Sequence, residues 1–126
     1  MICYECVYGH LVNESDNLIC VITNDGWWGD TQGHKQHFSY SKLRAIESRK
    51  SLVRSANTGI SGVILPNGRV SSSLQWDKKE YLSTEVGIYD QKTFYNKYGD
   101  YIGRISAFIS VMILLIFIPK RIIFSS

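Results

Sequence analysis

The 126-residue sequence lacks three features that would assign it to common classes of protein. It has only three cysteines, and an odd number argues against a closed framework of disulfides. Its net charge of +3 is too small to indicate nucleic-acid binding, so no nucleic acid is expected as a partner. The N-terminus has neither the basic residues nor the long apolar segment of a cleavable signal peptide. The length suffices for one domain with a modest core.

Two of the cysteines, Cys3 and Cys6, form a C-x-x-C pair, which could be a redox pair or half of a zinc site. A zinc site needs two more ligands, and the spacing of Cys20 and the histidines matches no common zinc finger. Cys6 and Cys20 are more simply small buried apolar residues. We therefore expect no metal and no cofactor.

The pattern of apolar runs and turn residues predicts alternating strands and helices. Residues 18–23 form a continuous apolar run typical of a strand buried on both faces. Residues 61–65 and 69–73 flank a Pro-Asn-Gly turn and predict a hairpin. Further strands are expected at residues 51–56 and 81–86, a helix at residues 34–48, and irregular structure at residues 87–100.

The predicted helix at residues 34–48 has a partly amphipathic pattern. Its apolar stripe consists of Phe38, Leu43, Ala45 and Ile46. The charged residues are expected to form a solvated face and a basic C-terminal end: Lys42, Arg44, Glu47, Arg49 and Lys50. His34 and His37 lie near the helix start and are expected to serve in capping and packing.

The last part of the chain is strongly apolar. Residues 105–118 carry no charge, but this run alone would extend only ~21 Å as a helix. Residues 101–124 would extend ~36 Å, enough for a bilayer core of ~30 Å. We predict a transmembrane helix at residues 101–124, with the C-terminus in the cytoplasm because Lys120 and Arg121 follow the apolar run.

Three short motifs indicate a pocket at the ends of buried strands. They are Ile-Cys-Tyr-Glu at residues 2–5, Thr-Asn-Asp-Gly-Trp-Trp-Gly at residues 23–29 and Asn-Thr-Gly-Ile-Ser at residues 57–61. Open α/β sheets bind ligands at the carboxyl ends of their strands. Cys3 is a candidate nucleophile, because a helix beginning after it would present the backbone N–H of Tyr4 to a thiolate or an oxyanion.

Together with Gln-His at residues 36–37, Leu-Arg-Ala-Ile-Glu at 43–47 and Leu-Val-Arg-Ser-Ala at 52–56, these motifs resemble the C-terminal part of the bacterial apolipoprotein N-acyltransferases. That family belongs to the nitrilase, or carbon-nitrogen hydrolase, superfamily. The order and approximate spacing of the motifs hold over residues 2 to about 121, and the apolar tail agrees independently.

The resemblance implies an α/β fold, with residues 1–100 as the C-terminal part of a nitrilase-type α-β-β-α sandwich and residues 101–124 as the transmembrane helix. It implies a location in the cell inner membrane, with residues 1–100 on the periplasmic side. The implied reaction is an acyl transfer through a cysteine thioester. The implied partners are a phospholipid donor, an apolipoprotein acceptor and the membrane.

The resemblance also implies roles for individual residues. Cys3 matches the nucleophile, the backbone N–H of Tyr4 would contribute to the oxyanion site, and Glu5 matches a supporting acid. Four further residues are expected around the substrate pocket: Asn24, Trp27, Arg54 and Asn57.

One departure from the family pattern is large. In the family, a general-base glutamate and a catalytic lysine precede the cysteine, whereas only two residues precede Cys3. Lys35, Lys42 and Glu14 are possible substitutes, but their positions give no reason to choose them. We expect a fragment that is inactive alone, and a second chain that carries the missing N-terminal half is a candidate partner.

Two other readings remain open. One is a carbon-nitrogen hydrolase of the same superfamily, acting on amides or nitriles. The other is a non-catalytic membrane-anchored remnant or metal-binding module, which metal analysis of the purified protein would distinguish.

Overall fold

A computed structural model of the protein describes residues 1–12 and 17–123. Its elements in chain order are the 3₁₀ helices η1 (Cys3–Val7) and η2 (Gly9–Val12), β1 (Ile19–Thr23), the 3₁₀ helix η3 (Gly26–Trp28), α1 (Gln32–Ser48), β2 (Leu52–Ala56), β3 (Ser61–Ile64), β4 (Val70–Leu74), α2 (Phe94–Tyr98) and α3 (Tyr101–Ile123). Glu14 and Phe124, which entered the sequence predictions, lie outside the described residues.

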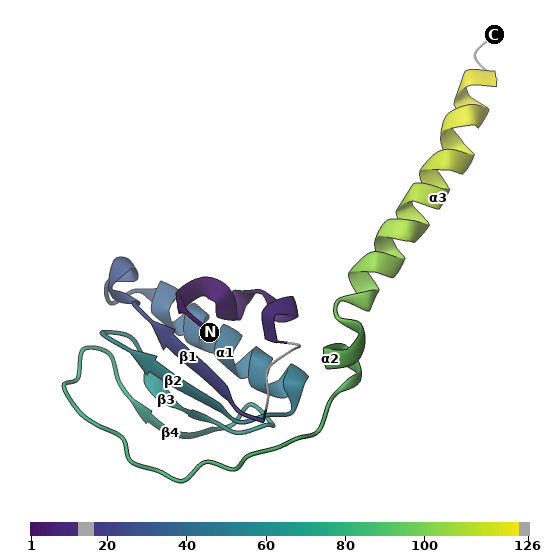
Figure 1. Ribbon diagram of the computed structural model, residues 1–126. Helices are drawn as coiled ribbons and strands as arrows, with labels where there is room; N and C mark the ends of the chain where they lie inside the picture. The colour runs from purple at the N-terminus through teal and green to yellow at the C-terminus, as the bar shows by residue number, and fades with distance from the viewer. Residues whose placement is uncertain (13–16, 124–126) are drawn as a thin grey trace.

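A four-stranded sheet in the order β1-β2-β3-β4 forms the centre of the fold (Figure 1). β1 and β2 are parallel, with Ile19 opposite Leu52, whereas β2–β3 and β3–β4 are antiparallel. Parallel neighbours need a long crossover connection, and α1 supplies it. The predicted mixed α/β class is confirmed.

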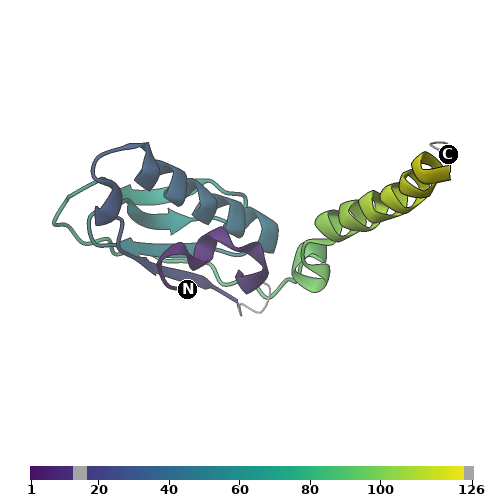
Figure 2. The ribbon, with the colours of Figure 1, turned by 90° about the horizontal axis from the view of Figure 1, so that it is seen from above.

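The helix α1 and the short helix η1 lie side by side over one face of the sheet (Figures 1 and 2). The core between these layers is apolar: Cys6, Val12, Ile19, Val21, Phe38, Ala45, Leu52 and Ile64. The described residues thus supply one sheet and one covering helix layer of the predicted α-β-β-α sandwich.

The buried face of α1 differs from the prediction. Leu43 and Ile46 are exposed, whereas the buried stripe is largely polar: His34, His37, Phe38, Ser41, Arg44, Ala45 and Ser48. Arg44 and Lys50, which were expected to face solvent, are also buried. The apolar pattern misidentified the face, because the buried polar side chains of His37 and Ser41 have hydrogen-bonding partners beneath the helix.

The predicted hairpin is confirmed. The Leu65 N–H donates to the Arg69 carbonyl at 2.8 Å, and Gly68 closes the turn at φ 81°. Glycine adopts this left-handed conformation without the steric cost that a side chain would add.

The predicted strand at residues 81–86 is wrong, because these residues form no regular element. They belong to a long irregular segment, residues 75–93, which we call the strap and which runs outside β4 toward α2 (Figure 1). The strap is tied to the sheet region by hydrogen bonds from Asp77 N–H to the Thr58 carbonyl and from Tyr89 N–H to the Asn17 carbonyl. Residues 87–100 contain the short helix α2, which Thr93 caps by accepting from Asn96 N–H at 3.1 Å.

The C-terminal helix α3 extends away from the sheet (Figures 1 and 2). The prediction of helical structure from residue 101 is confirmed, but the prediction of a transmembrane helix is not. Among residues 1–12 and 17–123, no helix is long and apolar enough to cross a membrane. The first turns of α3 carry Gly103, Arg104 and Ser106, and the uncharged run beyond Arg104 extends only ~21 Å.

Candidate active site

The N-terminal residues place Cys3 at the carboxyl end of β1. Ile2 forms a parallel bridge with Ile22, and the Ile22 N–H donates to the Met1 carbonyl at 3.0 Å. At Cys3 the chain turns from this extended pairing into η1, with a φ of 50°. A left-handed conformation at a residue other than glycine is strained by about 1–3 kcal/mol and needs support from its surroundings.

Glu5 supplies part of that support. Its carboxylate Oε2 accepts a 2.7 Å hydrogen bond from the Ile2 N–H, which closes the first turn of η1. Glu5 itself is exposed. Its carboxylate therefore braces the backbone on the N-terminal side of Cys3.

The Cys3 thiol is partly exposed and faces several hydrogen-bond donors. The Thr23 hydroxyl has the largest effect in lowering the pKa of Cys3; burial opposes it, and the backbone N–H groups of Asn24 and Tyr4 and the charge of His37 add to it. Each of these groups stabilises the thiolate, which is the nucleophilic form of cysteine. The role of the Tyr4 N–H in an oxyanion site stays a prediction.

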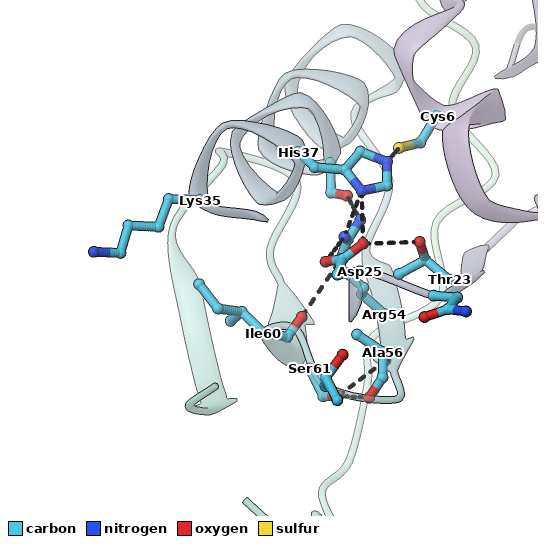
Figure 3. A network of polar contacts seen from close by, with 12 residues as sticks. Cys6, Thr23, Asp25, Lys35, His37, Arg54, Ala56, Ile60 and Ser61 are labelled. Atoms are coloured by element: carbon cyan, nitrogen blue, oxygen red, sulfur yellow. Dashed lines mark hydrogen bonds and ion pairs between the residues drawn. The ribbon is translucent and has the colours of Figure 1, made fainter. Parts of the chain in front are cut away.

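A buried polar network lies beneath this turn (Figure 3). The Cys6 Sγ lies 3.1 Å from His37 Nε2, and His37 Nδ1 lies 2.9 Å from Asp25 Oδ1. The network connects η1, the loop after β1 and helix α1. The sequence analysis considered Cys6 as part of a C-x-x-C pair or as a buried apolar residue, and it expected His37 to serve in capping and packing. It placed Asp25 in a pocket motif without giving it a role of its own.

Arg54 anchors the network to the sheet. Its Nη2 donates to Asp25 Oδ2 at 2.7 Å, and its remaining nitrogens donate to the Ser41 hydroxyl at 2.9 Å and the Ile60 carbonyl at 3.2 Å. Arg54 and Asp25 are both buried. A buried charge pair is tolerable only when its remaining polar atoms are also bonded, as they are here.

The protonation of His37 follows from its neighbours. Arg54 Nη2 also lies 3.0 Å from His37 Nδ1, but arginine only donates, so the Nδ1 proton is directed to the carboxylate. Burial lowers the pKa of His37, but Asp25 and Cys6 outweigh burial and raise it to about 9. His37 is therefore an imidazolium at neutral pH.

The same charges act on the two acidic members of the network. Burial raises the pKa of Cys6, but the hydrogen bond and charge of His37 and the charge of Arg54 reverse the effect and lower it. Burial likewise raises the pKa of Asp25, and His37 and Arg54 again reverse the effect. The result is an alternating chain of groups in which Arg54 and His37 are cations, Asp25 is an anion, and the thiol of Cys6 has a lowered pKa.

Aromatic rings cover the outer side of His37. The Tyr4 ring stacks on the imidazole with centroids 5.4 Å apart, and the Trp28 ring meets it edge-on at 5.1 Å. Tyr4 and Trp28 also contact each other at 6.1 Å. A small pocket of about 100 Å³ opens between these rings, lined also by Gly33, Gln36 and Tyr40.

Asn24 and Asn57 join the two loops that follow the parallel strands. Asn57 Nδ2 donates to Asn24 Oδ1 at 2.7 Å, and Asn57 Oδ1 accepts from the Asp25 N–H at 3.2 Å. Trp27 lies in the same region, but its side chain is 82% exposed, and it is Trp28 that packs on His37.

The structure thus brings Cys3, Tyr4 and Glu5 together with the Asn24–Asn57 bridge, and it buries Arg54 below them. Two sequence signals pointed to the overlooked residues. One is the charged Arg54 within a predicted strand, directly after Leu52 and Val53, and the other is the polar residues at helical spacing from His34.

Two other features bear on the chemistry. Lys35, a possible substitute for the family lysine, points away from the network (Figure 3). Within the described parts of the chain, no group of three or more His, Cys, Asp or Glu residues could hold a metal ion. All three cysteines are free thiols.

Comparison with known proteins identifies the family to which the chain belongs. The sequence profile of the carbon-nitrogen hydrolases matches residues 1–91. The chain belongs to the carbon-nitrogen hydrolase family.

More specific similarity is to the apolipoprotein N-acyltransferases, as the motifs suggested. The chain is 35% identical to that of Wigglesworthia glossinidia brevipalpis over 98% of its own length, and 36% identical to that of Haemophilus ducreyi over 87%. It covers 25% and 23% of those proteins, so it spans about a quarter of the length of the relatives it matches.

Solved structures confirm the fold. An amidase from Nesterenkonia sp. matches 84% of this chain with a TM-score of 0.53 and 17% identity, and 41% of the amidase is covered. A C145A mutant of the Nesterenkonia AN1 amidase, described as a member of the nitrilase superfamily, gives a TM-score of 0.52 at 16% identity, with 82% of this chain and 42% of that one covered. At this identity the likeness establishes the fold alone.

Proposed function

We propose that Cys3 is the nucleophile of an acyl transfer from a phospholipid to the N-terminal amine of an apolipoprotein. The observation that carries this proposal is the position of the thiol. It sits at a strained strand-to-helix turn beside the Thr23 hydroxyl and two backbone N–H groups, and its pKa is lowered. The similarity to apolipoprotein N-acyltransferases supplies the substrate class.

The chemistry proceeds in two transfers. The Cys3 thiolate attacks the ester carbonyl of the phospholipid, a C–S bond forms, the C–O bond breaks, and the lysophospholipid oxygen takes a proton. The amine of the acceptor then attacks the thioester, a C–N bond forms, the amine gives one proton to the general base, the C–S bond breaks, and the thiolate is regenerated. This proton replaces the one that the lysophospholipid oxygen took in the first transfer. The thioester divides one difficult transfer into two easier steps.

The surrounding residues have separate roles in this proposal. The Tyr4 N–H stabilises the oxyanion of each tetrahedral intermediate, as backbone N–H groups do in acyl-transfer enzymes. Glu5 braces the turn, and the Asn24–Asn57 bridge holds the pocket edge. The exposed indole of Trp27 contacts the lipid substrate, while buried Arg54 acts only through Asp25.

We also propose that the reaction needs a general base and a lysine from a further segment. The largest influences on Cys3 come from Thr23, Asn24, Tyr4 and His37, and neither a glutamate nor a lysine is among them. A cleft of about 510 Å³ lies between the sheet and the strap, lined in part by Ser55, Tyr81 and Leu82. A second polypeptide could supply the segment.

The test is formation of the thioester. The chain is incubated with phospholipid vesicles, alone and with a polypeptide corresponding to the part of the Haemophilus ducreyi relative that this chain does not span. We expect a mass increase of one acyl group at Cys3 only in the presence of the second polypeptide, and its removal by neutral hydroxylamine. Cys20→Ser is the matched control, because Cys20 is an exposed thiol on the adjacent strand.

Acylation that persists in Cys3→Ser would contradict the assignment of the nucleophile. Acylation of the isolated chain would contradict the need for a further segment. Failure of Cys3 to acquire an acyl group under both conditions, with the fold intact by circular dichroism, would overturn the proposed function.

Association with the lipid bilayer is a separate part of the proposal. The side chains of α3 are exposed on all sides as far as residue 117, and they include Phe108, Ile109 and Leu115. A helix apolar on all faces is stable against lipid rather than water. Co-flotation of the chain with anionic vesicles, weakened by Phe108→Asp with Ile109→Asp and kept by Tyr81→Asp, would support this role.

Hydrolysis of an amide is the alternative reaction, because the family match is to carbon-nitrogen hydrolases in general. The same thioester would then be attacked by water. Two outcomes would favour this alternative reaction. One is release of free fatty acid without transfer to a peptide amine, and the other is release of ammonia from a simple amide.

A further inference from the structure

His37 makes contact with η1 at two places. Its ring stacks on the Tyr4 ring, and its Nε2 lies 3.1 Å from the Cys6 Sγ. Tyr4 directly follows Cys3, and Cys6 lies one 3₁₀ turn beyond it. One imidazole thus restrains the residues on the C-terminal side of Cys3.

The other side of the imidazole is fixed to the rigid part of the fold. His37 Nδ1 donates to Asp25 Oδ1, and Asp25 is held in turn by Arg54 from β2. The ring therefore has little freedom to rotate or translate. Because Tyr4 and Cys6 both contact this fixed ring, their positions are restrained, and so is the turn at Cys3.

A second connection reaches Cys3 through Thr23. The Thr23 hydroxyl lies 3.0 Å from Asp25 Oδ1 and also interacts with the Cys3 thiol. A hydroxyl has one proton, so the carboxylate and the thiolate compete for it. The Thr23 hydroxyl donates to Asp25 Oδ1, and His37 donates to the same oxygen. This oxygen is therefore shared by two donors and attracts the Thr23 proton less strongly than it would without His37.

We propose that His37 is a positioning residue for Cys3, holding the strained turn through Tyr4 and Cys6 and tuning the thiolate through Asp25 and Thr23. The inference rests on the proposed function only in treating Cys3 as the nucleophile. It assigns a role to a histidine that does not touch the reacting atoms.

The charged and titratable groups that face His37 lie on three different parts of the fold. Cys6 lies on η1, Asp25 lies in the loop after β1, and Arg54 lies on β2. Tyr4 and Trp28 cover the ring, and the pKa of about 9 keeps it cationic across the neutral range. Cys3 therefore has a fixed positive charge nearby whenever its thiolate is needed.

The test uses alkylation of the isolated chain and does not depend on acyl transfer. The rate of iodoacetamide reaction at each cysteine is followed from pH 5 to 10 by fragmentation mass spectrometry of the N-terminal peptide. For His37→Gln we expect the midpoint of the Cys3 profile to move to higher pH and the rate at pH 7 to fall about threefold to tenfold, since a pKa unit changes the thiolate fraction tenfold. Exposed Cys20 serves as the internal reference.

His34→Gln is the matched control. His34 lies one turn earlier on α1, is equally buried, and its ring contacts the Trp76 ring in a tilted arrangement with centroids 4.4 Å apart. We expect the Cys3 profile of this variant to equal that of the wild type. A merely structural effect of losing a buried histidine would change both variants alike and would contradict the proposal.

Two further measurements test the positioning role of His37 if the His37→Gln variant does not fold. Tyr4→Leu removes the stacked ring from a half-exposed position and keeps the backbone N–H, and we expect it to slow Cys3 alkylation at pH 7. Nitrogen NMR of the wild type should show His37 protonated up to about pH 9. Unchanged Cys3 reactivity in Tyr4→Leu, or titration of His37 near 6.5, would overturn the inference. If the alkylation and NMR results are as expected but Cys3 acquires no acyl group in the thioester test, the proposed function is contradicted and the role of His37 is not.

Discussion

Arg54 Nη2 lies 2.7 Å from Asp25 Oδ2, with both side chains buried at the base of the site. The pair joins β2 to the loop after β1, and the chain of polar contacts from Arg54 to Cys6 runs through Asp25 and His37. Removing one partner of such a pair leaves an uncompensated buried charge. The pair therefore contributes to the stability of the domain and, through His37, to the position of η1.

Arg54→Met should lower the free energy of unfolding by about 3–5 kcal/mol, because Asp25 then keeps a buried charge with one cation fewer. Urea denaturation followed by circular dichroism measures the change. Lys35→Met is the matched control, since Lys35 is exposed and points away from the network. A loss for Arg54→Met no larger than that for Lys35→Met would contradict the role assigned to the pair.

The sheet and its crossover could be predicted from the sequence because their signals are local. An apolar run of β-branched residues precedes the loop after β1, and a Pro-Asn-Gly turn closes the β3–β4 hairpin. Each signal acts within a few residues and agrees with its neighbours. The predicted strand at residues 81–86 failed because alternation alone does not provide a neighbouring strand with which to pair.

The buried network could not be predicted in the same way. Its members come from four elements, and a periodicity analysis counts His37, Ser41 and Arg44 as polar and therefore exposed. Their burial depends on partners far away in sequence, such as Asp25 and Arg54. The motif containing Cys3 was found because neighbouring residues carry it, whereas the residues that position Cys3 are assembled only by the fold.

Gly59 approaches the Asp25 carboxylate so closely that a Cβ at this position would overlap its oxygen. Asp25 is held on both oxygens and has little room to move. Gly59→Ala should therefore destabilise the protein by about 2–3 kcal/mol, as overpacking commonly does. Ser55→Ala, at an exposed position of the adjacent strand, should change stability by less than about 0.5 kcal/mol in the same urea titration.

Trp27 and Trp28 are neighbours in sequence with different surroundings. Trp28 packs against Tyr4 and His37, whereas Trp27 is largely exposed. Trp28→Ala should cost about 2–3 kcal/mol through lost packing. Trp27→Ala should cost less than about 0.5 kcal/mol. Equal losses of stability in the two variants, measured by urea titration with circular dichroism, would contradict the packing role of Trp28 against Tyr4 and His37.

The Cys6–His37 pair should make stability depend on pH in a way that one variant reveals. The pKa of His37 is raised from 6.5 to about 9 by folding, so its contribution is complete below 6.5 and is lost as the pH rises through 9. The pKa of Cys6 is lowered from 9.0, so its contribution is complete above 9.0 and is lost as the pH falls through the lowered value. Where the two ranges overlap, between the lowered pKa of Cys6 and pH 9, the two dependences oppose each other.

Replacing Cys6 with alanine should remove one side of this balance. His37 would remain bound to Asp25, so its pKa should stay above 6.5, and the stability of Cys6→Ala should decline by about 1–2 kcal/mol between pH 6.5 and 9. The wild type should change much less over the same interval. Cys20→Ala serves as the control for the loss of a thiol without a charged partner and should follow the wild type. Urea titrations at closely spaced pH values would measure the three slopes, and parallel curves for Cys6→Ala and the wild type would mean that Cys6 and His37 do not share a proton.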